Sequence, residues 1–188
     1  MALRIFIAIN LPESVKDKLV EFQEKWKEIP CKWTKRENLH ITLLFIGYLK
    51  EELLPNVISA TKEVAKRHKS FWINLNKISY FPPQKKLPKM IWVLGERSEE
   101  LFSLQKDLEN IIFKNNSLSK ILIPEKREFS CHITLARIKK WQLKEMENFP
   151  EIETKIKLGF KVGSIEIMES KLKRSGPKYS VLESFPLS

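Results

Sequence analysis

The tetrapeptide His-Ile-Thr-Leu occurs twice in this chain, at residues 40–43 and again at residues 132–135. The chain contains only three histidines, so two of them lie in identical local sequences. An imidazole has an ordinary pKa of about 6.5 and can therefore accept or donate a proton near neutral pH. A threonine hydroxyl two residues later can donate a hydrogen bond to an anionic oxygen. The repeated tetrapeptide therefore predicts proton-transfer chemistry at a phosphate group.

Both copies lie in apolar, β-branched runs, which predict β-strands. Side chains alternate between the two faces of a strand, so His40 and Thr42 share one face while the isoleucine and leucine share the other. The same alternation places His132 beside Thr134. If the two strands border one cleft, two imidazoles and two hydroxyls surround a single ligand. We expect His40 and His132 to be catalytic and the two threonines to bind phosphate.

Hydrolysis of a cyclic phosphodiester would use such a pair directly. One group must take a proton from the attacking water, and another must give a proton to the departing ribose oxygen. The two groups must lie on opposite sides of phosphorus, because the attacking and leaving oxygens are roughly in line. One histidine from each half of the chain fits this requirement, and the threonine hydroxyls would stabilise the developing charge.

Other residues that often carry chemistry are less informative here. His68 lies in KRHKS at the end of a predicted helix, where a cation is favourable, and is expected at the surface and outside the catalytic site. Cys131 precedes the second motif, but alternation turns its side chain away from His132, so a packing role is expected. The two cysteines form no CxxC pair, and no HExxH spacing occurs. No metal and no other cofactor is therefore expected.

The elements that must position the two motifs follow from the hydrophobic pattern. Apolar runs predict strands at residues 4–10, 32–34, 39–47, 71–81, 90–95, 129–138, 154–160, 162–170 and 179–185. Helical spacing predicts helices between Pro12 and Pro30, at residues 51–68, at residues 98–113 with Ser98 as N-cap, and at residues 142–147. Prolines and lysines between residues 82 and 89 predict a long basic hairpin loop.

The two motifs are separated by 132 − 40 = 92 residues, close to half of the 188-residue chain. Each copy lies in a strand-like run and precedes a helical segment, so the order of elements is also roughly repeated. We therefore expect residues 1–188 to form one domain of two similar lobes, produced by internal duplication.

The amino-acid composition indicates which classes of partner are plausible. The formal net charge is +11, from 34 Lys and Arg against 23 Asp and Glu. This excess favours a polyanion such as nucleic acid, although a solvated lysine-rich surface explains it equally well. No apolar run approaches the roughly 20 residues that span a bilayer, and MALRIFIAIN lacks the features of a signal peptide. No membrane association and a cytoplasmic location are expected.

Several segments resemble the LigT-like branch of the two-histidine phosphoesterases, the RNA 2′,3′-cyclic phosphodiesterases formerly called 2′-5′ RNA ligases. The resemblance covers essentially the whole chain through the segments RIFIAINLP, KWTKRENLHITLLFIG, YFPP, FSCHITLAR and GPKYSVLESFPL. It implies an α+β fold of two pseudo-symmetric lobes, each an antiparallel sheet with helices outside, around a central cleft. One departure is Cys131, because family members often carry proline before the second histidine.

The resemblance also implies an activity. Members hydrolyse a terminal 2′,3′-cyclic phosphate of RNA to a 2′-phosphate without a metal; by this resemblance His40 is the proton donor to the 3′ oxygen and His132 the acceptor that activates water. The implied partner is RNA with a cyclic-phosphate end, tRNA fragments included, and no obligate protein partner is evident. Strand alternation alone does not assign the two histidine roles.

Further contacts with RNA are open from sequence. Arg137 could bind phosphate bidentately, but simple alternation places it on the opposite face from His132 unless a bulge intervenes. The lysine-rich segments 84–89 and 171–178 could hold the backbone, and ordinary surface roles explain them as well. Base stacking and core packing are the two interpretations for three aromatic residues: Phe81, Trp92 and Tyr179.

Three other functions remain open from sequence. The same acid and base could join a cyclic-phosphate end to a 5′-hydroxyl as a 2′-5′ RNA ligase. The chain could instead be a non-catalytic RNA-binding module that acts through its basic surface. A metal-dependent phosphodiesterase is disfavoured by the shortage of clustered ligands.

Overall fold

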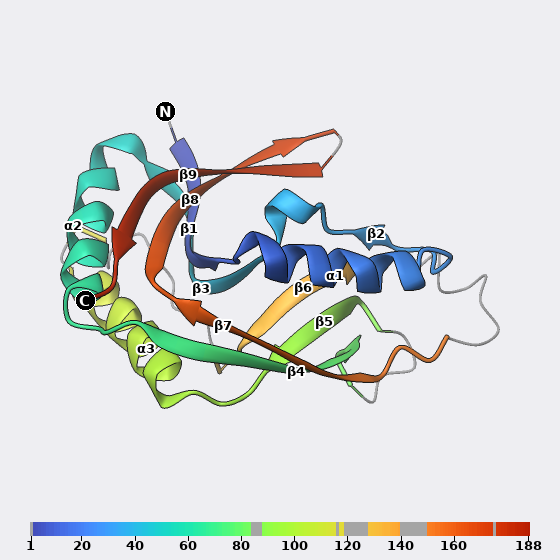
Figure 1. Cartoon of the computed structure of the whole chain (residues 1–188). Helices are drawn as coiled ribbons and strands as arrows, with labels where there is room; N and C mark the ends of the chain where they lie inside the picture. Colours follow the sequence, from blue (N-terminus) through green and yellow to red (C-terminus); the bar gives the residue numbers. More distant parts are fainter. Residues whose placement is uncertain (1, 84–87, 116, 119–127, 140–149, 175) are drawn as a thin grey trace.

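A computed structural model describes residues 2–83, 88–115, 117–118, 128–139, 150–174 and 176–188. Within these ranges the chain forms three α-helices and two short 3-10 helices (Figure 1). Their bounds are α1 Glu13–Lys25, η1 Arg36–Asn38, η2 Glu51–Leu53, α2 Leu54–Ala65 and α3 Glu99–Lys114. Among the described residues, no helix is long and apolar enough to cross a membrane.

Nine strands of the described chain form one antiparallel sheet. Their bounds are β1 Ala2–Asn10, β2 Lys32–Trp33, β3 His40–Lys50, β4 Phe71–Phe81, β5 Met90–Gly95, β6 His132–Arg137, β7 Thr154–Val162, β8 Ser164–Lys173 and β9 Gly176–Pro186. The strand order is β7-β4-β5-β6-β3-β1-β8-β9, and β2 pairs with β6 off this path. The fold is therefore α+β with antiparallel pairing, as expected.

The two motif strands, β3 and β6, lie at the centre of this order. On one side, β3 continues into β1, β8 and β9, which we call the first lobe; on the other, β6 continues into β5, β4 and β7, which we call the second lobe. A single residue pair, Ile41 with Ile133, joins the two lobes in one continuous sheet. The sequence predicted two separate sheets, and their connection through the motif strands themselves is a feature of the tertiary structure.

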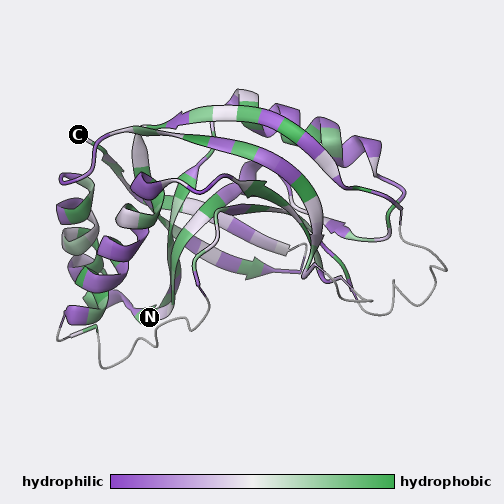
Figure 2. Ribbon diagram, turned by 90° about the horizontal axis from the view of Figure 1, so that it is seen from below, coloured by the Kyte–Doolittle hydropathy of each residue, from purple (hydrophilic) through white to green (hydrophobic). Residues whose placement is uncertain are grey.

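One face of the sheet carries the hydrophobic core. Buried residues from β1, β3, β5 and β6 join apolar residues of α1, α2 and α3 in one large cluster, which contains Ile7, Ile41, Val93 and Ile133. Along the strands hydrophobic and hydrophilic residues alternate (Figure 2), as expected for a sheet covered on one side. We call the other face, which carries the motif histidines, the open face.

Each motif strand contains a β-bulge at the leucine that ends its tetrapeptide. Neither Leu43 in β3 nor Leu135 in β6 has a partner in the neighbouring strand, β1 or β5. The extra residue changes the phase of the alternation, so two consecutive side chains point into the core. Phe45 and Arg137, two residues further on, therefore return to the open face.

Most predicted elements are confirmed, with ends that differ by a few residues. The 90–95 and 71–81 strands form an antiparallel hairpin with the predicted bounds. The hydroxyl of Ser98 accepts a hydrogen bond from the backbone N–H of Leu101 at 3.2 Å, so Ser98 is the N-cap of α3. The predicted helix at 142–147 and residues 84–87 of the basic loop lie outside the described residues.

Candidate active site

The two motifs lie side by side on adjacent antiparallel strands. Ile41 pairs with Ile133, so His40 lies next to Thr134 and Thr42 lies next to His132. The histidines are thus diagonal neighbours on one face, a relation that places their backbones roughly 7–8 Å apart. The two tetrapeptides that are 92 residues apart in sequence therefore meet around one point of the open face.

The imidazole of His40 is held by two local hydrogen bonds. Its Nδ1 lies 2.7 Å from the backbone carbonyl oxygen of Asn38, and its Nε2 lies 2.9 Å from Oγ1 of Thr42. A carbonyl can only accept, so Nδ1 carries a proton and donates it. In the neutral ring Nε2 is then the free base, and it accepts from the threonine hydroxyl. The motif threonine is therefore in direct contact with the nitrogen that would exchange protons.

The imidazole of His132 is oriented in the same way. Its Nδ1 lies 2.8 Å from the backbone carbonyl oxygen of Ser130, again two residues before the histidine. Both rings thus use Nδ1 for a backbone contact and present Nε2 for chemistry. The ring of His132 also stacks on Trp92, with centroids 3.8 Å apart, and Trp92 stacks on Phe81 at 3.4 Å. This three-ring stack fixes the plane of His132.

Different aromatic neighbours hold His40. Its ring lies 5.0 Å from the ring of Phe6 in β1 and 5.3 Å from the ring of Tyr179 in β9, and the planes of His40 and Tyr179 are nearly perpendicular. The loop before His40 is also fixed to β9, because the side-chain amide of Asn38 donates to the carbonyl of Pro177 at 2.9 Å. The C-terminal hairpin therefore helps to position a histidine that is more than 130 residues away in sequence.

The charge state of His40 follows from these surroundings. Burial, together with the nearby positive charges of His132 and Arg137, lowers the pKa of His40 to about 4, although the hydrogen bond to Asn38 opposes this shift. His40 is therefore neutral at neutral pH in the ligand-free protein.

Arg137 lies on the open face, contrary to the prediction from simple alternation. The bulge at Leu135 is the physical reason, because it moves the following residues by one position relative to the strand faces. Arg137 is exposed and pairs across the sheet with Met90 and with Lys32 of β2. Two cations, Arg137 and Lys32, are thus on the same face as the paired histidines.

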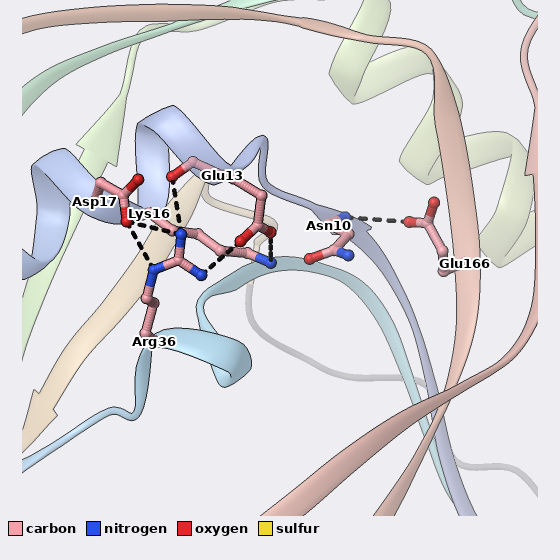
Figure 3. A network of polar contacts seen from close by, with 6 residues as sticks. All are labelled: Asn10, Glu13, Lys16, Asp17, Arg36 and Glu166. Atoms are coloured by element: carbon pink, nitrogen blue, oxygen red, sulfur yellow. Dashed lines mark hydrogen bonds and ion pairs between the residues drawn. The ribbon is translucent and has the colours of Figure 1, made fainter.

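A polar network lies just outside the first motif (Figure 3). Arg36 in η1 donates to a carboxylate oxygen of Asp17 at 2.7 Å and to one of Glu13 at 2.5 Å, which ties η1 to the start of α1. At the end of β1, the backbone N–H of Asn10 donates to the buried carboxylate of Glu166 at 3.1 Å. The Arg36 contacts stabilise the segment just before the motif. The Asn10 contact stabilises the neighbouring strand, because Asn10 pairs with His40 across the sheet.

The structure also tests the other two residues that the sequence analysis considered. Cys131 is 4% exposed, and burial raises the pKa of its thiol to about 12, so the predicted packing role is confirmed. His68 was expected at the surface, but its side chain is 13% exposed and its Nε2 lies 2.9 Å from the carboxylate of Asp107. The ring is thus less exposed than expected, because its partner Asp107 belongs to α3, which packs against α2.

Sequence reasoning missed the residues that orient the imidazoles. The carbonyls of Asn38 and Ser130 carry no side-chain signal, although both stand two residues before a motif histidine. Trp92 was a candidate for base stacking, but it is 7% exposed and has protein rings on both faces. Tyr179 keeps partial exposure, and its ring lies 5.3 Å from that of His40.

No group of three or more His, Cys, Asp or Glu that could hold a metal ion occurs among the residues placed by the structure. The expectation that no metal is used stays a prediction, and sensitivity of activity to a chelator is its test.

Comparison with known proteins identifies the family. A family model described as LigT like Phosphoesterase matches residues 9–92, the part of the chain that holds the first motif. An RNA 2′,3′-cyclic phosphodiesterase of Thermus thermophilus is 32% identical over 193 residues, which cover 98% of this chain and 90% of the relative. The chain belongs to the LigT-like phosphoesterase family.

Other relatives of this LigT-like phosphoesterase have the same name. An RNA 2′,3′-cyclic phosphodiesterase of Methanocaldococcus jannaschii is 29% identical, with 97% of this chain and 100% of the relative covered. One from Aeropyrum pernix is 33% identical, with 82% of this chain and 85% of the relative covered. The match to the Methanocaldococcus jannaschii relative extends well beyond residue 92 and includes both halves of the chain.

Solved structures agree with this membership. The crystal structure of the Thermus thermophilus protein TT0787 matches with a TM-score of 0.86 and 29% identity, over 98% of both chains. The crystal structure of E. coli LigT complexed with 3′-AMP matches with a TM-score of 0.78 and 20% identity, over 100% of this chain and 99% of that one. At that identity the second match shows the fold alone.

Proposed function

We propose that this LigT-like phosphoesterase hydrolyses the 2′,3′-cyclic phosphate end of RNA with His40 and His132 as its acid–base pair. The observation that carries the proposal is the pairing of the two motif strands at Ile41 and Ile133, which brings both imidazoles to one point of the open face. The curated relatives named RNA 2′,3′-cyclic phosphodiesterase support the substrate class. We propose RNA fragments with cyclic ends, tRNA fragments among them, as substrates in the cytoplasm.

The reaction needs one proton to enter and one to leave. Nε2 of His132 takes a proton from water while the water oxygen forms a new bond to phosphorus. The bond from phosphorus to the 3′ oxygen breaks, and Nε2 of His40 gives its proton to that oxygen. The product is a 2′-phosphate with a free 3′-hydroxyl, and proton exchange with solvent returns both rings to their starting states.

Three further residues surround the reacting group in this proposal. Thr42 and Thr134 flank the paired isoleucines on the open face, where their hydroxyls can donate to the non-bridging phosphate oxygens. Arg137 adds a permanent positive charge on the same face, suited to a phosphate that becomes more negative in the transition state. We propose that the hydrogen bond between Thr42 and Nε2 of His40 breaks when the phosphate binds. The Thr42 hydroxyl then donates to a phosphate oxygen, and the protonated Nε2 donates to the substrate.

The role of His40 as proton donor depends on the substrate. With a pKa of about 4 in the empty site, the ring is neutral at neutral pH and cannot donate from Nε2. A phosphodiester anion bound between the two rings attracts the protonated form of His40, so it raises the pKa of His40. Substrate binding and protonation of His40 are therefore coupled, and binding should take up a proton at pH values above about 4.

The primary test is turnover of a nucleoside 2′,3′-cyclic phosphate by the wild type, His40→Ala and His132→Ala. Each variant should lose about 10²–10⁴-fold in kcat, the usual contribution of one general acid or base. Circular dichroism and thermal unfolding serve as the folding controls. Mass analysis with 3′- and 2′-specific phosphatases identifies the product. Full turnover by either folded variant, or a 3′-phosphate product, would contradict the proposal.

A substrate with sulfur in place of the 3′ oxygen separates the two roles. A thiolate leaves without protonation, so the donor histidine becomes dispensable while the acceptor does not. We expect His40→Ala to regain most of its activity on the 3′-thio substrate and His132→Ala to stay inactive. The reverse pattern would exchange the roles.

A further inference from the structure

We infer that a strip of the open face on β4 and β7 binds the single-stranded RNA that leads to the reacting 3′ end. The strip consists of Trp72, Lys77, Lys155, Lys157 and Lys161. The inference rests on the proposed function, and it specifies an oligonucleotide with several ordered nucleotides as the preferred substrate over a mononucleotide.

Cross-strand pairing connects the strip to the active site. His132 pairs with Leu94, Leu94 with Lys77, and Lys77 with Lys155, so these four residues form one row across β6, β5, β4 and β7. Paired residues in a sheet share a face, and strands are about 4.8 Å apart, which places Lys155 roughly 14 Å from His132. A strand whose terminal phosphate reacts at His132 can therefore reach β7 within a few nucleotides.

The lysines of β7 are exposed and form no ion pair with the described residues. Lys155, Lys157 and Lys161 alternate with buried residues along the strand, so all three are exposed on the open face. No carboxylate of the described chain lies within salt-bridge distance of their ammonium groups, whereas Lys77 is paired with Glu153 at 2.9 Å. Exposed ammonium groups two and four residues apart on one strand suit the backbone phosphates of a single strand.

Trp72 adds an aromatic surface on which a base can stack. It is 63% exposed and pairs across the sheet with Lys161, so a large aromatic ring lies beside a free cation. Proteins that hold single strands combine a basic track with aromatic rings on which bases stack. A duplex offers no unstacked base, so Trp72 favours a single strand.

Lysines on an edge strand also have a simpler explanation, since β7 ends the sheet order and charges there prevent edge-to-edge aggregation. That explanation does not account for Trp72, which lies on β4, one strand inside the edge, and exposes an apolar surface.

The first lobe has exposed cations at the end of the β8–β9 hairpin, Lys171, Lys173, Arg174 and Lys178, but within its described residues none of them pairs across the sheet with an exposed aromatic ring. Its open face exposes the apolar side chains of Phe45, Tyr48 and Val181, and its cation Arg4 is already bonded to Ser170 at 2.7 Å and lies over the ring of Phe45. Charge complementarity therefore directs the RNA backbone to the second lobe.

The test compares two substrates: a nucleoside 2′,3′-cyclic phosphate and a single-stranded RNA of about ten nucleotides with the same cyclic end. The variants are the triple replacement K155Q/K157Q/K161Q and, separately, Trp72→Ala. We expect each variant to raise KM for the oligonucleotide about tenfold or more and to leave kcat and KM for the mononucleotide unchanged. Trp72→Phe should retain most of the oligonucleotide affinity.

The matched control is K62Q/K66Q/K106Q, which removes the same charge from exposed positions on and beside the helices. It should change neither KM. Binding of a 2′-phosphate oligonucleotide to the wild type and the β7 triple variant adds a readout without turnover. The slope of log affinity against log salt should decrease by about 2, at roughly 0.7 for each lost phosphate contact to a single strand.

Three outcomes would overturn the inference: an oligonucleotide KM that changes no more than in the control, an equal rise in both KM values, or equal competition by single-stranded and blunt duplex RNA. A strip that binds an acidic protein instead would give the first of these. Failure of the wild type to process either substrate would refute the proposed function. The slopes of log affinity against log salt would still show whether the strip binds RNA.

Discussion

At the scale of single residues, the two motif histidines are alike in sequence but differ in environment. Both donate Nδ1–H to a carbonyl two residues earlier, and both present Nε2. His40 is enclosed by Phe6 and Tyr179, whereas His132 is stacked on Trp92. Identical tetrapeptides can therefore support different proton-transfer roles, because the surroundings of the two rings differ.

The lowered pKa of His40 predicts a pH dependence of stability. The unfolded chain protonates this histidine near pH 6.5 and the folded chain near pH 4, so the unfolded state binds more protons between these values. The free energy of unfolding should therefore fall as pH drops from 6.5 to 4, by roughly 3 kcal/mol from this group. Urea unfolding of the wild type and His40→Gln across this range measures the effect as a difference. Parallel pH curves for the two proteins would show that His40 has no lowered pKa.

The stack on His132 predicts a positioning role for Trp92. Trp92→Ala should lower kcat by about tenfold or more with a smaller change in KM, because the imidazole loses its preferred plane while the phosphate-binding groups remain. Trp92→Phe keeps an aromatic face and should restore most of kcat. An Ala variant that is less stable but has normal kcat would show that Trp92 only packs the sheet.

At the scale of elements, the β-bulges determine which side chains reach the site. Both occur at the same motif position, at Leu43 and at Leu135. Alternation predicted the face of the sheet correctly for Thr42 and Thr134, because they precede the bulge. It predicted the wrong face for Arg137, because Arg137 follows the bulge. Equivalent bulges in equivalent strands are one reason why we propose that the two lobes arose by duplication within a single domain.

The strand that precedes the second motif has a strict steric requirement. A Cβ on Gly95, the last residue of β5, would lie 2.4 Å from Sγ of Cys131, whereas a Cβ on Gly163 would have no neighbour within 4 Å. Gly95→Ala should lower the free energy of unfolding by about 1–3 kcal/mol, and Gly163→Ala should be nearly neutral. Thermal unfolding of both variants measures this. Equal stability of the two would mean that the Cys131 side chain can move without cost.

At the scale of the whole molecule, the chain crosses between the lobes twice, apart from the short β2, which pairs with β6. The first lobe combines β1 and β3 with the C-terminal strands β8 and β9, while the middle of the chain supplies the second lobe. In Figure 1 the earliest and latest parts of the chain accordingly lie together in the first lobe. Neither half of the sequence therefore contains a complete lobe. One core cluster also spans both lobes.

This topology predicts a single cooperative unit. Amides in β1 and in β5 should exchange with solvent through the same global unfolding, with the same free energy and the same dependence on denaturant. Native-state hydrogen exchange with mass analysis of peptides from each strand measures this. Exchange of β5 at a clearly lower free energy than β1 would show that the second lobe unfolds alone and would contradict the single domain.

The sequence alone predicted most of the elements and the candidate histidine pair. Two copies of His-Ile-Thr-Leu indicated the pair, and the local hydrophobic period indicated the strands and helices, because both signals lie within a few neighbouring residues. Only the tertiary structure decided that the motif strands pair directly at Ile41 and Ile133, that Arg137 turns to the open face, and that the tail of the chain holds His40. Those features depend on pairing between distant segments, and strand register is set by the packing of the whole sheet, which no local pattern encodes.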